Sequence, residues 1–225
     1  RRRGVAPAGR LMPSTHPPVE ILALDVDGVL LDPERHGAGN WSDEVAARFG
    51  ITREQLRAAF FAPSWDDVIN GRRPIEDALA EALESIGTET SVDDVLECWF
   101  DADYAVVDRA VALARRATDR GIRVVLATNQ EHRRAEYLRR RLGSEIELSD
   151  VVYSADLGCQ KHDPAFFELA SERLNVARER RSSVLFVDDV QHNVDVARAA
   201  GWQALQAPPG GEWIDEVGAL LGVVV

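Results

Sequence analysis

Two pairs of carboxylates each follow a short apolar run of the sequence. Asp25 and Asp27 close the first such run, and Asp188 and Asp189 follow the run at residues 183–187. Carboxylates that crowd together repel one another unless a cation neutralises them, and a ligand set made only of oxygen favours Mg²⁺. The sequence therefore predicts a magnesium site if the fold brings the two pairs together.

Three further polar side chains also follow apolar runs. Thr128 and Asn129 come after residues 123–127, and Lys161 lies beyond residues 151–154. Of the 26 lysines and arginines, all but Lys161 are arginine. An ammonium is a compact point charge and a guanidinium a planar fork, so the two are not interchangeable in a tight site. The single lysine therefore indicates a functional role. From composition alone, a surface lysine retained by chance is an equal alternative.

The apolar runs are the predicted strands that must position these side chains. They lie at residues 19–26, 123–127, 151–154 and 183–187, with a short final strand near 202–205. Helical patterns separate them, and strands that alternate with helices form a parallel sheet with helices on both faces. The carboxyl ends of such strands meet at one edge, where open α/β sheets bind their ligands. We therefore expect an α/β fold with a Rossmann-like parallel core and a polar site at that edge.

The stretch between the first strand and residue 108 contains no strand pattern. Its periodicity predicts helices at residues 43–49, 53–61, 74–86 and 92–104. The predicted organisation is a mobile tail at residues 1–18, an α/β core at 19–33 plus 108–225, and an inserted helical domain at 34–107. The only methionine, Met12, is the expected natural start.

Composition narrows the classes of protein and partner. Hydrophobic residues make up 45% and charged residues 28%, as in ordinary globular proteins. The net charge of -12 disfavours nucleic acid and anionic membranes as partners. No apolar run reaches the roughly 18 residues of a membrane span, so we expect a cytoplasmic protein. Cys98 and Cys159 have no CxxC partner, which predicts free thiols rather than a zinc site or a disulfide.

Four motifs of the chain, in their order along the sequence, resemble those of the haloacid dehalogenase superfamily. They are DVDGVL (residues 25–30), LATN (126–129), Lys161 and VDDVQHN (187–193). The resemblance spans roughly residues 19–205. Because the insert lies between the first and second motifs, it resembles the helical type-one cap of subfamily I, which closes over the active site. The resemblance implies a magnesium-dependent phosphatase that acts on a small phosphate ester.

The resemblance also implies roles for the acidic residues. Asp25 would be the nucleophile that forms an aspartyl-phosphate, and Asp27 the general acid and base. Gly28 would let the backbone turn closely around the phosphoryl group. Mg²⁺ would bind Asp25, the backbone carbonyl of Asp27 and Asp189, with Asp188 supporting this metal site.

The remaining motif residues would hold the phosphoryl group. The Thr128 hydroxyl and the Asn129 backbone N–H would bind its oxygens, and Lys161 would offset the charge on Asp25 and on the phosphate. Asn193 would reach metal-bound water or orient Asp189, with a helix N-cap as the alternative.

Several points stay open at this stage. His162 beside the lysine departs from the usual third motif, and it is either a substrate contact or a solvated side chain. An acid at Asp27 disfavours the dehalogenase branch, and an insert without lysine disfavours the phosphonate-cleaving branch. A phosphomutase and a non-catalytic binding module of the same fold remain alternatives. Candidate pocket residues in and beside the insert, or else parts of its core or surface, are His36, Trp41, Trp65, Arg72, Arg73, Trp99 and Tyr104.

Overall fold

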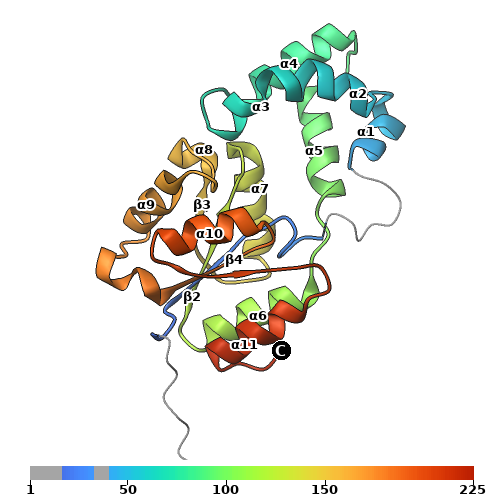
Figure 1. The fold of residues 1–225 in the computed structure, drawn as a ribbon. Helices are drawn as coiled ribbons and strands as arrows, with labels where there is room; N and C mark the ends of the chain where they lie inside the picture. Colours follow the sequence, from blue (N-terminus) through green and yellow to red (C-terminus); the bar gives the residue numbers. More distant parts are fainter. Residues whose placement is uncertain (1–16, 33–40) are drawn as a thin grey trace, which may run out of the picture.

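The computed structural model describes residues 17–32 and 41–225, and its centre is a parallel sheet of five strands. The strand order is β3-β2-β1-β4-β5 and every pairing is parallel (Figure 1). The strands are β1 (Ile21–Leu24), β2 (Arg123–Thr128), β3 (Leu148–Tyr153), β4 (Val184–Asp188) and β5 (Gln203–Gln206). The predicted parallel α/β core is confirmed, with β3 beginning three residues earlier than expected.

Helices cover both faces of this sheet because the buried strands are apolar on both sides. Leu22 and Leu24 of β1 point into one core cluster and Ile21 and Ala23 into another. The first cluster includes residues of α6 (Asp108–Asp119), α7 (His132–Gly143) and α11 (Glu212–Leu221). The second cluster includes residues of α9 (Pro164–Arg173) and α10 (Gln191–Ala199). Two short elements of the core domain are α8 (Ser154–Leu157) and the 3-10 helix η2 (Arg178–Ser183).

The helical insert, residues 41–102, has a hydrophobic cluster of its own that includes Phe60, Trp99 and Phe100. Its helices are α1 (Trp41–Phe49), α2 (Arg53–Leu56), the π-helix η1 (Arg57–Phe61), α3 (Ala62–Ile69), α4 (Ile75–Ile86) and α5 (Val92–Ala102). Figure 1 shows them gathered at one end of the sheet.

The prediction of a helix ending at residue 61 was wrong, because the chain stays helical through Pro63. Pro63 lies near the start of α3, directly after a π-helical turn, where its missing N–H is tolerated. The predicted N-terminal tail falls almost wholly outside the described residues, as do Met12 and His36.

The insert is joined to the core beside the loop that follows β1. Leu31 forms an antiparallel bridge with Val106, and the backbone N–H of Asp32 donates to the Ala105 carbonyl at 2.8 Å. The chain leaving α5 therefore runs alongside the loop that carries Asp27. Among the described residues, no helix combines the length and the apolar character that crossing a membrane requires, and Cys98 and Cys159 carry free thiols.

Candidate active site

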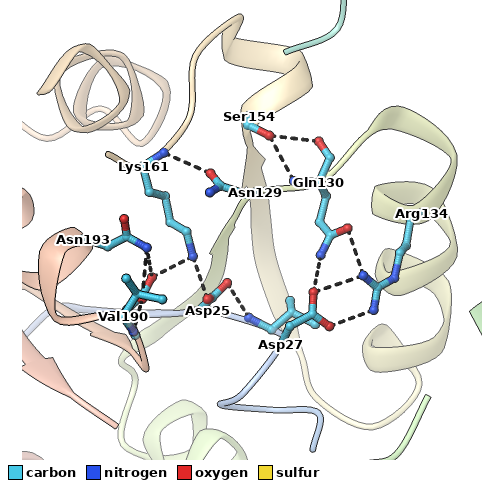
Figure 2. A network of polar contacts seen from close by, with 11 residues as sticks. Asp25, Asp27, Asn129, Gln130, Arg134, Ser154, Lys161, Val190 and Asn193 are labelled. Carbon is cyan, nitrogen blue, oxygen red and sulfur yellow. Dashed lines mark hydrogen bonds and ion pairs between the residues drawn. The ribbon is translucent and has the colours of Figure 1, made fainter. Parts of the chain in front are cut away.

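Lys161 holds two carboxylates together at the carboxyl edge of the sheet. Its Nζ lies 2.6 Å from Asp25 Oδ2 and 2.6 Å from Asp188 Oδ2 (Figure 2). Asp25 follows β1 directly, while Asp188 is the last residue of the adjacent β4. The Lys161 side chain is only 2% exposed, so the chain's one lysine is a buried ion-pair partner rather than a surface residue.

Burial and charge act in opposite directions on the pKa values of Asp25 and Lys161. Desolvation raises the pKa of Asp25 to about 7, against the opposing effect of Lys161. Burial by itself would lower the pKa of Lys161, but Asp25 and Asp188 outweigh it and raise that pKa. A divalent cation beside Asp25 would favour its ionised form and reverse the effect of burial.

A third carboxylate completes an acidic cluster in which Asp25, Asp188 and Asp189 each offer an oxygen within 4.8 Å of the others. Burial, followed by the nearby Asp188, raises the pKa of Asp189. Gly28 has φ +80°, and a Cβ there would lie 2.6 Å from Asp189 Oδ2. The cluster thus fits a hard cation such as Mg²⁺ by its donor chemistry, and only glycine leaves room for Asp189 beside the loop.

Asp188 is already surrounded by donors. Asn193 Nδ2 lies 3.1 and 3.2 Å from its two oxygens, and the Val190 N–H donates to Oδ1 at 2.8 Å. Asn193 therefore contacts Asp188. It does not cap α10, whose N-cap is Val190. With Lys161 as well, the lone pairs of Asp188 are largely used, which leaves Asp25 and Asp189 as the better-placed metal ligands.

The second motif, at residues 126–129, contacts the segment that carries Lys161. Thr128 is buried at the end of β2. The Asn129 side chain accepts a hydrogen bond from the Lys161 backbone N–H at 2.9 Å, and this contact holds the backbone of the lysine beside the second motif.

Asp27 has different partners from Asp25. Gln130 Nε2 donates to Asp27 Oδ2 at 2.8 Å, and Arg134 donates to both of its oxygens, at 3.0 and 2.7 Å. Figure 2 shows its carboxylate turned toward α7, away from the Asp25–Lys161 pair. Gln130 and Arg134 were not predicted from the sequence. The clue available was position, since Gln130 directly follows the second motif and Arg134 comes four residues later.

Comparison with known proteins agrees with this arrangement. The family model of haloacid dehalogenase-like hydrolases matches residues 19–201. The chain belongs to this family. It is therefore a hydrolase, as predicted, with the Rossmann-like α/β fold of its relatives.

Relatives of this haloacid dehalogenase-like hydrolase include a phosphatase. That protein, from Mycobacterium tuberculosis, is 27% identical over 210 residues, or 88% of this chain and 92% of its own length. A solved structure of a family enzyme from Bacteroides thetaiotaomicron, in complex with magnesium and inorganic phosphate, has a TM-score of 0.69 at 16% identity. It covers 87% of this chain and 97% of that one. A dehalogenase matches with a TM-score of 0.60 at 19% identity, over 94% and 99% of the two chains. These structural matches show the shared fold.

The insert of this hydrolase contacts the core near the site through residues 69–71. Ser154 Oγ donates to the Ile69 carbonyl at 2.7 Å and accepts from the Gln130 N–H at 3.0 Å. Gly71, at φ +70°, packs so closely that a Cβ would lie 2.1 Å from the Ala155 carbonyl oxygen. The insert is therefore seated against the edge of the sheet that carries the acidic cluster.

Most candidate pocket residues belong to the body of the insert or to its surface. Trp99 is part of the insert's hydrophobic cluster and Trp41 and Trp65 pack against it. Arg72 pairs with Asp66 and Asp67, and Arg73 with Glu81. Tyr104 packs edge-on against Tyr137. His162 is exposed. These contacts of the arginines and aromatics lie within the insert or between the insert and α7, whereas residues 69–71 contact Ser154 and Ala155 beside the site.

Proposed function

We propose that the protein is a magnesium-dependent phosphatase that hydrolyses a small phosphorylated metabolite through an aspartyl-phosphate on Asp25. The observation that carries the proposal is the buried Lys161 between Asp25 and Asp188, with Asp189 close by. The phosphatase from Mycobacterium tuberculosis and the magnesium and phosphate bound to the enzyme from Bacteroides thetaiotaomicron support it.

Asp25, Asp189 and the backbone carbonyl of Asp27 would hold Mg²⁺, and Asp188 would support them through Lys161. When bound, the cation supplies positive charge beside the phosphoryl oxygens and the attacking carboxylate. Gly28 leaves the space that Asp189 needs for this role.

The protein's own residues would carry out two displacements. A carboxylate oxygen of Asp25 attacks phosphorus, and the bond from phosphorus to the ester oxygen breaks as Asp27 protonates that oxygen. Asp27 then takes a proton from the water that attacks the aspartyl-phosphate, which releases phosphate and restores Asp25. Lys161, the Thr128 hydroxyl and the Asn129 N–H would stabilise charge on the phosphoryl oxygens in both steps.

The insert would act as the cap of this active site. Its contacts with Ser154 and Ala155 support this role, because they seat residues 69–71 at the carboxyl edge of the sheet. A cap in this position would exclude water from the phosphoryl group and select the substrate. The boundaries proposed for it are residues 34–107, within a core of residues 19–33 and 108–225.

The test is phosphate release from p-nitrophenyl phosphate and from a panel of sugar, nucleotide and small-metabolite phosphates, each with Mg²⁺ or EDTA. Asp25→Asn should abolish release. Asp195→Asn is the matched control. Asp195 is a carboxylate on α10 that accepts a hydrogen bond from the Gln191 side chain and is not part of the acidic cluster. Acid quenching followed by mass spectrometry should find the phosphoryl group on Asp25 during turnover. A folded protein that binds Mg²⁺ but releases no phosphate would overturn the proposal in favour of a phosphomutase or a binding module.

A further inference from the structure

Arg134 makes a two-point contact with Asp27 from a buried position on α7. Its Nη1 lies 3.0 Å from Asp27 Oδ2 and its Nη2 lies 2.7 Å from Asp27 Oδ1. The Arg134 side chain is 10% exposed, whereas that of Asp27 is 43% exposed. A planar guanidinium that bridges both oxygens of a carboxylate fixes the orientation of the carboxylate as well as its place.

The position of Arg134 is itself fixed. Glu131 caps the N-terminus of α7 by accepting from the backbone N–H groups of Arg133 and Arg134. Gln130 contacts both members of the pair, because its Nε2 donates to Asp27 and its Oε1 accepts from Arg134. Without these contacts, the half-exposed Asp27 side chain would be free to rotate.

The same guanidinium also reaches the end of the insert. Arg134 Nη2 lies 3.4 Å from Asp103 Oδ2, and Asp103 is the C-cap residue of α5. Asp103 Oδ2 accepts from the indole N–H of Trp99 at 3.1 Å, and Trp99 belongs to the hydrophobic cluster of the insert. A continuous chain of contacts therefore runs from the core of the insert to Asp27.

We propose that Arg134 is a positioning residue that sets the direction of the Asp27 carboxyl group and links it, through Asp103, to the placement of the insert. The inference rests on the proposed phosphatase function. The contact with Arg134 holds the Asp27 carboxylate toward α7. A general acid works only within hydrogen-bond reach of the oxygen that it protonates, so the residue that holds Asp27 sets the position from which it must reach the leaving group. Because Nη2 of Arg134 faces both Asp27 and Asp103, a shift of α5 changes where Arg134 holds Asp27.

The experiment compares kcat/KM for p-nitrophenyl phosphate and for an alkyl phosphate substrate in Arg134→Gln and in the wild type, both with Mg²⁺. The quantity kcat/KM covers the steps up to departure of the leaving group. A p-nitrophenolate departs without protonation, while an alkoxide requires an acid. Arg134→Gln should lower kcat/KM for the alkyl ester about 100-fold and for p-nitrophenyl phosphate less than about threefold. Arg134→Lys keeps the charge but not the two-point contact, and it should show the same selectivity.

Arg133→Gln is the matched control on the same helix. Arg133 pairs with Glu76 and Asp93 of the insert, each at 3.0 Å, through a half-exposed side chain. The variant loses contacts between core and insert but none of those that Arg134 makes with Asp27. It should lower kcat/KM for both substrates by the same small factor.

Equal losses for both esters in the Arg134 variants would overturn the inference and leave the proposed function intact. The same holds if Arg133→Gln shows the selectivity of Arg134→Gln. A wild type that releases phosphate from neither ester would overturn the proposed function, and the inference with it. If Arg134→Gln does not fold, as judged by circular dichroism, Arg134→Lys decides the result.

Discussion

The two acidic residues of the first motif have opposite surroundings, although only Val26 separates them. Asp25 is buried and faces Lys161, which the carboxyl edge of the core positions together with Asp188. Asp27 is half exposed and faces Arg134, which also contacts the insert. In the proposed mechanism, the core would hold the nucleophile, and a helix that contacts the insert would hold the general acid.

Loss of the Lys161 ammonium beside Asp25 should have the largest effect on stability and activity. Lys161→Met leaves Asp25 and Asp188 buried without their partner, and removing one member of a buried ion pair costs about 3–5 kcal/mol. Urea unfolding in EDTA should show this loss, and kcat of the folded variant should fall about 1000-fold. The half-exposed Arg133→Gln should cost less than about 1 kcal/mol. A folded Lys161→Met with normal kcat would limit the lysine to a structural role.

A metal-free protein should lose stability as pH rises, and Mg²⁺ should restore it. Burial raises the pKa of Asp25 to about 7 from its ordinary 3.8, so the folded chain keeps a proton that the unfolded chain releases. This contribution is complete below about pH 4 and disappears as pH rises through about 7. In EDTA, Asp25 alone should lower the free energy of unfolding by about 2 kcal/mol between about pH 5 and 8. Excess Mg²⁺ should remove most of this Asp25 contribution.

Glu131 provides the comparison for this pH dependence. Burial also raises its pKa to about 7, and its hydrogen bonds go to backbone N–H groups of α7 rather than to the acidic cluster. Asp25→Asn should abolish the Mg²⁺ response of the unfolding curve, and Glu131→Gln should preserve it. A full response in Asp25→Asn would argue against a metal at Asp25.

Loss of the contact between residues 69–71 and the core should lower activity less than loss of the Lys161 ammonium. Gly71→Ala introduces a Cβ 2.1 Å from the Ala155 carbonyl oxygen, which should lift residues 69–71 from the core and lower kcat/KM about tenfold. Gly50→Ala is the matched control, with the same φ of +70° and no atom within 4 Å of the added Cβ. Both variants should lose stability through backbone strain, but only Gly71→Ala should lose activity. Equal activities would contradict the role of this contact.

The smallest effect should come from the link between Arg134 and the insert. Asp103→Asn removes the ion pair at 3.4 Å but keeps an acceptor for the Trp99 indole. Because Arg134 keeps both hydrogen bonds to Asp27 when this longer contact is lost, kcat/KM for an alkyl phosphate should fall only about threefold. The value for p-nitrophenyl phosphate should stay unchanged. A loss as large as that of Arg134→Gln would place the main contact at Asp103 instead of Asp27.

The sequence by itself determined the core of the protein and one side of its site. Apolar runs alternating with helices define a parallel sheet, and parallel strands must end at one edge. The meeting of Asp25, Asp188 and Asp189 follows from that rule, since each lies at or just beyond the end of a strand. Lys161 follows β3 only after the short helix α8. The physical reason is local, because alternation and strand ends are visible in short windows of sequence.

Only the tertiary structure decided the other side of the site. Arg134 looks like any of the arginines of α7 in the sequence, and its contact with Asp27 spans 107 positions. Asn193 has the spacing of a helix cap, but the approach of β4 to α10 directs it to Asp188. The continuation of the helix past Pro63 depends on a π-helical turn packed into the insert. These outcomes depend on packing between distant segments, which no local pattern records.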